Sequence, residues 1–501
     1  MRILHAPTEP SMTSQIIPVE PFDYVVFGGT GDLARRKLLP ALFQLHRHQL
    51  ADRLHRIVAT GRARIPDEDF RTTVKSNLQK FLPAGVWSEE VWSTFNDRLF
   101  YSNIDAGKAS DYEALGKLLD LGEAPGRLYY LATLPSLYGQ ICQQVQAANL
   151  VDEHSGVVLE KPLGHDLASC QQINEQVAQV FREEETYRID HYLGKETVQN
   201  LLAVRFGNPL FSPMWRNTFV DNVQITVAED IGVEGRADYY AKTGALRDMV
   251  QNHLLQLLSI VAMEPPVSLR AADIRDEKMK ALRALMPITA DNARECTVRG
   301  RYAAGAVNGE AVRGFLDEAE FGNADDTETF VAIKAAINNW RWAGVPFYLR
   351  TGKRLSRRYS EIVIEYKRQP FSLFANDANE LTNKLVIRLQ PEESISLHTL
   401  NKKPGLTNKL SLQPVELNLT NDARNKVDRY DAYERLLLDA IYGDQTLFMR
   451  RDEVETAWHW IDSIIQAWED NDTPIKPYNS GTMGPNAATA LIAVDGRNWH
   501  E

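Results

Sequence analysis

A carboxylate, an imidazole, a phenol and an ammonium group lie close together in the stretch RIDHYLGKET, residues 188–197. They belong to Asp190, His191, Tyr192 and Lys195. A carboxylate beside an imidazole can orient a group that moves protons, and imidazole, phenol and ammonium groups all donate hydrogen bonds to anions. The stretch therefore predicts either a proton-transferring and anion-binding surface or a polar loop that contains an Asp–His pair.

A second histidine, His253, lies in the strongly apolar run DMVQNHLLQLL. Its apolar neighbours recur at helical spacing. The run alone favours a histidine that is packed in the core with its hydrogen bonds satisfied. A catalytic role for His253 therefore needs support from another part of the sequence.

A glycine-rich turn in VVFGGTGDLA follows a short apolar strand and precedes a helical pattern. Gly28, Gly31 and Ala34 stand three residues apart, and Thr30 occupies the middle position of the pattern. Glycine lets the backbone approach a pyrophosphate, which the N–H groups at a helix N-terminus then bind. The turn alone is weak support, but its position between strand and helix predicts a dinucleotide site.

The next predicted strand indicates which nucleotide is bound. An NAD site usually has an acid at the end of this strand, which binds the ribose 2′-hydroxyl. Here the chain reads ATGRAR, with Arg62 and Arg64 and no acid before Asp67. Arginines suit a 2′-phosphate, so NADP is expected and NAD is a weaker alternative. The alternative is that both arginines are solvated turn residues.

The elements that must position these residues alternate in the first part of the chain. Short apolar strands are expected at residues 24–27, 56–61, 98–104, 127–133 and 156–164, with helical patterns between them. This alternation predicts βαβ units and a doubly wound parallel sheet of the Rossmann type. Pro40 is expected to break or kink the helix that follows the glycine turn.

The second half has strand-like segments at shorter intervals, and several alternate apolar and polar residues. This pattern predicts a larger α+β domain with a mostly antiparallel sheet that is covered by helices. The expected strands are 222–230, 328–339, 346–355, 360–367, 383–391, 395–402 and 410–419, and the expected helical blocks are 245–263 and 431–444. The predicted division is a tail at 1–20, a nucleotide-binding domain at 21–204 and a substrate and oligomerisation domain at 205–501.

Composition excludes several classes of protein. The net charge of −11 argues against nonspecific binding of nucleic acid, which needs a basic face. No apolar run approaches the roughly 20 residues of a membrane span, and the N-terminus does not resemble a signal peptide. Three cysteines without a CxxC pair indicate no disulfide framework, so a cytoplasmic location is expected.

Several motifs occur together in order: GGTGDLA, EKPLG, RIDHYLGK, RDMVQNHLLQ, WRWAGVPFYLRTGKRL and DAYERLLLD. With them the chain closely resembles the glucose-6-phosphate dehydrogenase family, bacterial type, from Tyr24 to about Pro485. RIDHYLGKE is the most specific of these motifs. The resemblance implies oxidation of the C1 hydroxyl of glucose 6-phosphate to a lactone, the first step of the pentose phosphate pathway, with hydride transfer to NADP.

That reaction requires a base near neutral pKa within hydrogen-bond reach of the hydroxyl, and histidine suits this role. The resemblance implies that His253 is the base and that Asp190 orients it and stabilises its protonated form. It also implies that His191, Tyr192 and Lys195 bind the substrate phosphate. The core interpretation of His253 becomes the less probable one once RDMVQNH is taken as a family motif.

The resemblance implies further contacts to substrate and nucleotide. Glu229 and Asp248 are expected to accept hydrogen bonds from sugar hydroxyls, although either can instead be a helix cap or a surface acid. The other expected substrate residues are Lys353, Lys161 and Arg358. Bacterial relatives often carry lysine at the position of Arg358. The expected cofactor residues are Gly28, Thr30, Gly31, Asp32, Leu33, Arg64, Asp105, Ala106, Lys161 and Pro162.

No metal is expected, because the nucleotide supplies the hydride chemistry and no HxxxH motif or cysteine cluster occurs. The resemblance also implies a homodimer or homotetramer. Two other functions stay open: an oxidoreductase for an unphosphorylated sugar, and a noncatalytic sensor of NADP or sugar phosphate. The predicted phosphate cluster argues against the first, and the presence of both Asp190 and His253 argues against the second.

Overall fold

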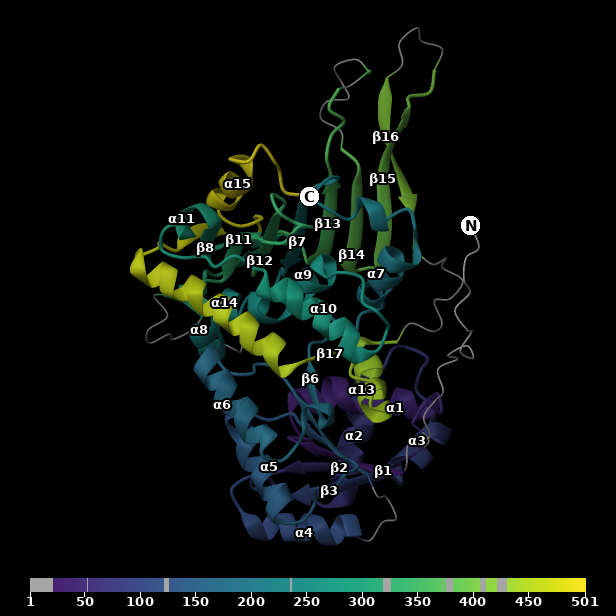
Figure 1. The fold of residues 1–501 in the computed structure, drawn as a ribbon. Coiled ribbons are helices and arrows are strands. Elements are labelled where there is room, and N and C mark those ends of the chain that lie inside the picture. The colour runs from purple at the N-terminus through teal and green to yellow at the C-terminus, as the bar shows by residue number, and fades with distance from the viewer. Residues whose placement is uncertain are drawn as a thin grey trace. The chain divides into compact units, whose positions relative to one another are not determined.

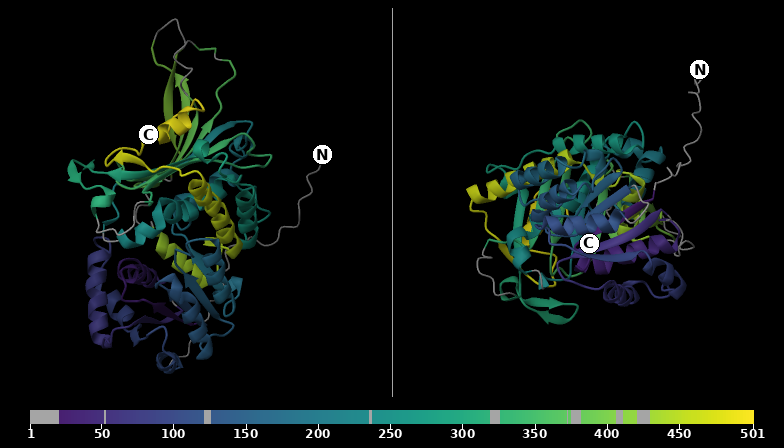
Figure 2. Two further views of the ribbon diagram at one scale, coloured as in Figure 1. Left: turned by 90° about the vertical axis from the view of Figure 1, so that its left-hand side faces the viewer. Right: turned by 90° about the horizontal axis from the view of Figure 1, so that it is seen from below.

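The computed structural model describes residues 21–51, 53–120, 126–234, 237–318, 326–371, 373–374, 382–405, 411–420 and 430–501. The chain divides into two compact units. The first comprises Met1–Glu160, Glu175–Ile189 and Tyr433–Leu447, and the second comprises Lys161–Asn174, Asp190–Ala432 and Phe448–Glu501. The predicted tail, residues 1–20, lies outside the described residues. The ribbon is drawn in Figure 1 and from two further sides in Figure 2.

The sheet of the first unit confirms the predicted doubly wound parallel architecture. Its strands follow the order β6-β5-β4-β1-β2-β3, and each neighbouring pair is parallel. The strands are β1 (Phe22–Phe27), β2 (Leu54–Gly61), β3 (Leu99–Asn103), β4 (Gly126–Leu131), β5 (Ser155–Leu159) and β6 (Thr186–Ile189). The order reverses at β1, where β2 pairs on one side and β4 on the other. This is the switch point at which open α/β sheets bind ligands.

The strands of this sheet are apolar because helices cover both faces of a doubly wound sheet. All six residues of β1 are buried. Asp23 is the one charged residue of β1, and it pairs with Arg56 on the neighbouring parallel strand β2. Their side chains form a buried ion pair with an N–O distance of 2.7 Å, which satisfies the requirement that buried charges be paired.

The sequence predicts a break or kink at Pro40, but the helix after the glycine turn is not broken there, because Leu38 and Leu39 keep helical backbone angles. A π-helical turn, η1 (Ala34–Leu38), precedes α1 (Leu39–Arg47), and Pro40 lies in the first turn of α1. Proline has no N–H group to donate to the preceding turn, and the first turn of a helix tolerates this. The other helices of the first part of the chain are α2 (Asp67–Phe81), α3 (Glu89–Asn96), α4 (Ala109–Asp120), α5 (Tyr138–Ala147) and α6 (Leu167–Ala178).

The second unit contains a nine-stranded sheet in the order β16-β15-β14-β13-β7-β12-β11-β8-β18. Most neighbours are antiparallel, as predicted, but β7 with β12 and β8 with β18 are parallel. The strands are β7 (Val220–Ala228), β8 (Thr297–Ala303), β11 (Phe330–Ala336), β12 (Pro346–Gly352), β13 (Tyr359–Tyr366), β14 (Lys384–Gln390), β15 (Ser394–Lys402), β16 (Leu412–Asn418) and β18 (Lys476–Asn479). A small hairpin pairs β9 (Gly305–Val307) with β10 (Glu310–Val312).

Helices pack against this sheet (Figure 1). The predicted block 245–263 forms a π-helical segment, η6 (Leu246–Leu254), followed by α9 (Leu255–Ala262). η6 contacts β12, and α15 (Asn486–Ala493) contacts β8 and β11. The remaining helices and the short strand in this part of the chain are α7 (Glu196–Gly207), α8 (Ala237–Ala245), α10 (Ala271–Arg283), α11 (Ala293–Cys296), α12 (Phe315–Glu318), α14 (Arg451–Asp470) and β17 (Phe448–Met449).

The second predicted helical block, 431–444, forms α13 (Ala432–Tyr442). Most of this helix belongs to the first compact unit, although it follows residue 205 in the sequence. The two compact units are therefore not continuous in sequence, whereas the predicted domains are. The predicted boundary between residues 204 and 205 stays a prediction. Cys142, Cys170 and Cys296 form no disulfide. Among the described helices, none has the length and apolar character needed to cross a membrane.

Candidate active site

A buried Asp–His pair lies in the second unit. The Nδ1 atom of His253 is 2.6 Å from Oδ1 of Asp190, and both residues are about 1 % exposed. The same carboxylate oxygen accepts the backbone N–H of Tyr192 at 2.9 Å. Residues that are far apart in sequence, 190 and 253, thus meet as the resemblance implies. An imidazole that contacts a buried carboxylate is the arrangement that a proton-transfer site needs.

The charges of this pair follow from its environment. Burial lowers the pKa of His253 below its usual value of 6.5, although the Asp190 carboxylate partly opposes this effect. Burial alone would raise the pKa of Asp190, but the charge and hydrogen bond of His253 outweigh burial and lower this pKa to about 2. At neutral pH the pair is therefore a carboxylate and a neutral imidazole. Because Nδ1–H donates to Asp190, the lone pair is on Nε2, which can accept a proton.

The π-helical segment η6 explains how two functional side chains come to one face. In a π-helix the backbone hydrogen bonds join residues five apart, so Asp248 and His253 stand one turn from each other. Their five-residue spacing would place them on different faces of an α-helix. Short π-helical insertions are frequent at functional sites.

The start of η6 is fixed by a buried acid, Glu328, which lies two residues before β11. The Glu328 side chain accepts the N–H of Leu246 at 2.9 Å, and its backbone carbonyl accepts the N–H of Ala245 at 3.0 Å. Gly244 precedes them with a φ of +66°, and a Cβ there would lie 2.4 Å from the Glu328 carboxylate. Burial raises the pKa of Glu328. The geometry of Asp248 and His253 therefore depends on a glycine and a glutamate that the sequence analysis did not identify.

The loop at residues 190–195 brings the predicted phosphate-binding groups next to this pair. The His191 ring lies 4.6 Å from the His253 ring, and the Tyr192 ring lies 4.5 Å from it, centroid to centroid. The Lys195 ammonium lies 5.4 Å from the centre of the Tyr192 ring and 3.4 Å from the carbonyl oxygen of Leu389. His191, Tyr192 and Lys195 are thus gathered within one loop beside His253.

Two further ion pairs lie at the ends of strands and at η6. Glu229 follows β7 and Lys353 follows β12, and these strands are parallel neighbours with Ala228 opposite Gly352. Their ends therefore coincide, and the Lys353 ammonium is 2.7 Å from the Glu229 carboxylate. Lys161 Nζ lies 3.2 Å from Asp248 Oδ1. Burial would raise the pKa of Asp248, but the nearby Lys161 and Lys353 lower it.

Arg358 differs from the other predicted substrate residues. It is exposed just before β13, and among the described residues it forms no hydrogen bond or ion pair with Lys195 or with the Asp190–His253 pair. Pro162 is half-buried directly after Lys161. Two residues that were not predicted also contact this cluster: the Ser360 hydroxyl lies 3.2 Å from that of Tyr192, and the Tyr240 ring lies 5.0 Å from the Lys353 ammonium. A serine in a strand and a tyrosine in a helical pattern give no signal of such contacts.

The first unit carries the glycine turn at the carboxyl end of β1. Gly28 has a φ of +81°, and a Cβ there would lie 2.4 Å from the carbonyl oxygen of Ala132. Only glycine fits this position, because an L-residue is strained at this φ and has no space. The helix then begins at Asp32 and Leu33, and the first N–H groups of a helix have no partner within the helix. The turn and the helix N-terminus are thus shaped to accept a pyrophosphate.

The loop after β2 presents Arg62 and Arg64, both exposed. Strand β3 fixes this loop, since the Asn103 amide donates to the Arg62 carbonyl at 2.8 Å and the Tyr101 hydroxyl donates to the Ala63 carbonyl at 2.7 Å. Asp67, the nearest acid after this strand, instead accepts the N–H of Tyr101 at 2.8 Å. The loop therefore offers guanidinium groups, while its nearest carboxylate is occupied by the backbone.

The remaining nucleotide candidates lie at the same edge of the sheet. Asp105 and Ala106 follow β3, where Asp105 is exposed and its carboxylate accepts the N–H of Gly107 at 3.1 Å. A Cβ on Gly61 would lie 3.1 Å from the Thr30 hydroxyl, so the ends of β1 and β2 are close together. The exposed Asp32 carboxylate pairs with Arg36 at 2.7 Å.

Two family models match consecutive parts of the chain. The model described as "Glucose-6-phosphate dehydrogenase, NAD binding domain" matches residues 25–200, and "Glucose-6-phosphate dehydrogenase, C-terminal domain" matches residues 202–500. Together they span nearly the whole sequence, so the match does not rest on the nucleotide-binding half alone.

Individual relatives give the same result. The chain is 51 % identical over 491 residues to glucose-6-phosphate 1-dehydrogenase of Rhizobium meliloti, covering 98 % of this chain and 100 % of that one. It is 48 % identical over 488 residues to the enzyme of Mycolicibacterium smegmatis, covering 96 % and 98 %. A solved glucose-6-phosphate dehydrogenase in complex with glucose 6-phosphate matches with a TM-score of 0.87 and 35 % identity, covering 96 % and 99 %. The chain therefore belongs to the glucose-6-phosphate dehydrogenase family.

Proposed function

We propose that, in the glucose-6-phosphate 1-dehydrogenase reaction, His253 removes the proton of the C1 hydroxyl while hydride leaves C1 for NADP. The product is 6-phosphogluconolactone. The bound nucleotide supplies the hydride acceptor, and the chain's own residues bind the sugar phosphate, orient it and move the proton. The proposal as a whole is tested by following reduced nicotinamide on addition of glucose 6-phosphate, with free glucose as the control.

The observation that carries the proposal is the buried Asp190–His253 contact at 2.6 Å. The Nδ1 atom of the imidazole is occupied by Asp190, so Nε2 is the nitrogen that accepts the proton. As the imidazole becomes cationic, the Asp190 carboxylate stabilises the new charge, because the two groups are buried and in direct contact. Proton removal and hydride departure together convert the C–O single bond of C1 into the carbonyl of the lactone.

The phosphate of the substrate is assigned to His191, Tyr192 and Lys195. Lysine supplies a full charge, and the imidazole and phenol supply N–H and O–H donors. Burial followed by the nearby His253 lowers the pKa of His191 well below its usual value. His191 is therefore a neutral donor in the absence of an anion, and Lys195 is the principal charge that attracts the phosphate.

The sugar hydroxyls are assigned to the two acid–lysine pairs. Glu229 and Asp248 are carboxylates that accept hydrogen bonds, and Lys353 and Lys161 hold them at 2.7 Å and 3.2 Å. Asp248 stands one π-helical turn from His253, so a hydroxyl on Asp248 would help to place C1 near the base. Arg358 has the weakest support, because it is exposed and shows no contact with this cluster among the described residues.

The nucleotide is assigned to the first unit, with the pyrophosphate at Gly28, Thr30, Gly31, Asp32 and Leu33. Arg64 is assigned to the 2′-phosphate, which makes NADP the preferred nucleotide and NAD a weaker one. Support comes from Asp67, whose carboxylate accepts a backbone N–H and so is not offered to a ribose hydroxyl. Asp105 and Ala106 are assigned to the adenosine side, and Lys161 and Pro162 to the cofactor side of the sugar.

No metal is assigned to this site. Asp190, His191 and His253 each bring an oxygen or nitrogen atom within 4.8 Å of the others, a spacing that a metal ion could also use. The reaction needs the Nδ1–Oδ1 contact for proton transfer, and hydride chemistry needs no metal. A homodimer or homotetramer and a cytoplasmic location stay predictions.

Replacing Lys195 by alanine is expected to raise the Michaelis constant for glucose 6-phosphate about 10- to 100-fold with a much smaller change in kcat. One lost hydrogen bond between charged groups, about 1.5–3 kcal/mol, has this effect. Steady-state kinetics measure it, and Lys117→Ala on the exposed face of α4 is the matched control. An unchanged Michaelis constant would remove Lys195 from the phosphate site.

Replacing Arg64 by alanine is expected to reduce the preference for NADP over NAD about tenfold or more, because the guanidinium contacts only the nucleotide that carries a 2′-phosphate. The ratio of kcat/KM for the two nucleotides measures this preference. Arg62→Ala is the comparison, since it removes the same charge two residues away. If the ratio changes only with Arg62, that residue binds the 2′-phosphate, and the assignment of Arg64 is wrong.

A further inference from the structure

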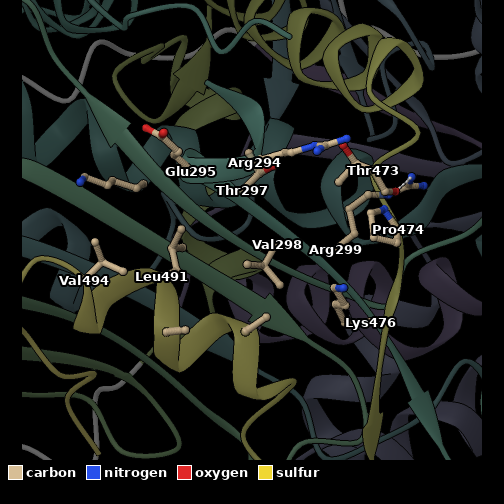
Figure 3. A pocket seen from close by; sticks show the side chains of 13 residues that line it. Arg294, Glu295, Thr297, Val298, Arg299, Thr473, Pro474, Lys476, Leu491 and Val494 are labelled. Carbon is tan, nitrogen blue, oxygen red and sulfur yellow. Dashed lines mark hydrogen bonds between the residues drawn. The ribbon is translucent and has the colours of Figure 1, made fainter. Parts of the chain in front are cut away.

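A cavity lies in the second unit, and neither Asp190 nor His253 borders it. It has a volume of about 850 Å³ and is bordered by the first residues of β8, by the segment before β18 and by α15 (Figure 3). This volume lies in the range of sites for small organic molecules. None of the residues that border it is assigned to the substrate or nucleotide.

One side of the cavity is apolar. Val298 of β8 and Leu491 of α15 form it, together with Ala487, Ala490 and Val494. Val298 and Leu491 are mostly buried, but Val494 is 86 % exposed. An apolar side chain this exposed at the margin of a cavity favours a ligand that has an apolar part.

The other side is basic. Arg294, Arg299, Lys334 and Lys476 border the cavity, against a single acid, Glu295. Arg299 is neutralised by Asp326 at 2.8 Å, and Lys334 is neutralised by Asp495 at 2.7 Å. Two positive charges are then left to attract an anion.

Those two charges are on Arg294 and Lys476. Arg294 donates to the backbone carbonyl of Asn471 at 3.1 Å, and within the described part of the chain neither Arg294 nor Lys476 forms an ion pair. Figure 3 shows that the Arg294 side chain extends toward Thr473, away from the neighbouring Glu295. The acid therefore does not cancel the charge at this end of the cavity.

Buried polar atoms at the same end also need a partner. Thr473 is 9 % exposed, and its hydroxyl forms no hydrogen bond among the described residues. The Nε atom of Arg299, a residue that is 6 % exposed, has none either. β18 pairs with β8 only from Gly300 onward, so residues 297–299 border the cavity with an edge that β18 does not cover. Unsatisfied buried polar groups are costly, so a polar ligand group at this end would be stabilising.

We propose that this cavity is a second binding site, for an amphipathic carboxylate. The carboxylate contacts Arg294, Lys476 and the Thr473 hydroxyl, and an aliphatic chain lies against Val298, Leu491 and Val494. A purely apolar ligand would leave the two cations and the hydroxyl unsatisfied. A small hydrophilic anion would leave the apolar side in water, so the combination of both sides selects an amphipathic one.

The test uses the full-length protein and decanoate, with binding measured by titration calorimetry. We expect saturable binding of one decanoate per chain. Decanol, which lacks the charge, and decyltrimethylammonium, which reverses it, should each bind at least about tenfold more weakly, as loss of one charged contact implies. Equal binding of decanol would show that the anionic part of the proposal is wrong.

Two substitutions locate the site. Lys476→Glu and Val494→Glu should each weaken decanoate binding about tenfold or more, because each places a carboxylate next to that of the ligand. Lys117→Glu on α4 and Val267→Glu, where Val267 is 87 % exposed, are the matched controls and should leave binding unchanged. All four variants should keep wild-type turnover of glucose 6-phosphate, which shows that they fold. No saturable binding, or binding that Lys476→Glu and Val494→Glu leave unchanged, would overturn the proposal.

Discussion

His253→Asn is expected to lower kcat for glucose 6-phosphate oxidation about 10³- to 10⁴-fold, the upper part of the usual range for a general base. Asparagine is similar in size and can donate an N–H to Asp190, so the buried site should stay filled. It has no nitrogen that accepts a proton near neutral pH. Steady-state kinetics give the loss in kcat, and calorimetric titration with glucose 6-phosphate should give a dissociation constant within a few fold of wild type.

The matched control is His459→Asn, which replaces an exposed histidine on α14 of the same unit. This variant should keep wild-type turnover. If His253→Asn also turns over at nearly the wild-type rate, another group removes the proton. If it binds no sugar phosphate, the loss reflects a collapsed site, and circular dichroism and the thermal unfolding temperature would show this.

Asp190→Asn is expected to lower kcat/KM about 10²- to 10⁴-fold. The carboxylate accepts Nδ1–H and so places the lone pair on Nε2, whereas an asparagine amide can donate to Nδ1 and favour the opposite tautomer. The carboxylate also opposes the effect of burial on His253. Without it, the pKa of His253 should fall further, and the imidazole becomes a weaker base.

The pH profile separates this effect from a purely structural one. Activity requires neutral His253, so it is lost as the pH falls through the pKa of His253. Because that pKa lies below 6.5, the wild-type kcat/KM should fall to half of its plateau at a pH below 6.5. In Asp190→Asn, kcat/KM should have a lower plateau at neutral pH, and its loss on acidification should begin at a still lower pH than in the wild type. If the plateau of kcat/KM is lower but its loss occurs at the same acidic pH as in the wild type, Asp190 acts only on the structure of the site.

Much of the fold follows from patterns that depend on local physics. The strands of the first unit are apolar runs because both faces of their sheet are covered, and glycine at position 28 reflects a φ of +81°. Among the described strands, six were not predicted: β6, β8, β9, β10, β17 and β18. β6 (TYRI) is too short to show a period, and β8 (TVRGRYA) contains two arginines and a glycine.

The proposed catalytic pair could be predicted only through the family motifs. His253 lies in an apolar run that physically resembles a core helix, and it is indeed 1 % exposed. The contact with Asp190 is non-local, and no sequence period encodes it. The π-helical geometry of η6 depends on the bond from Leu246 to Glu328, which is 82 residues away. Ser360 contacts Tyr192 although the two residues are 168 positions apart in the sequence, and the residues around either position do not predict the contact.

The parallel pairing of β7 with β12 is also a non-local contact that no sequence period encodes. It places Glu229 beside Lys353, but the two strands are separated by more than a hundred residues of other elements. The alternation of apolar and polar residues predicts that each is a strand with one covered face, not which strand is its neighbour. Sequence patterns therefore predicted the elements and the residue types of the site, and the structure was needed for their pairing.

The most direct test of the central claim is the formation of reduced nicotinamide by the purified protein. Glucose 6-phosphate is supplied with NADP or with NAD in parallel, and free glucose is the control. The proposed roles predict fast reduction of NADP with glucose 6-phosphate, slower reduction of NAD, and almost none with free glucose, because Lys195 and its neighbours bind the phosphate. Absence of reduction with either nucleotide would contradict the assigned reaction, and equal rates with free glucose would contradict the phosphate site.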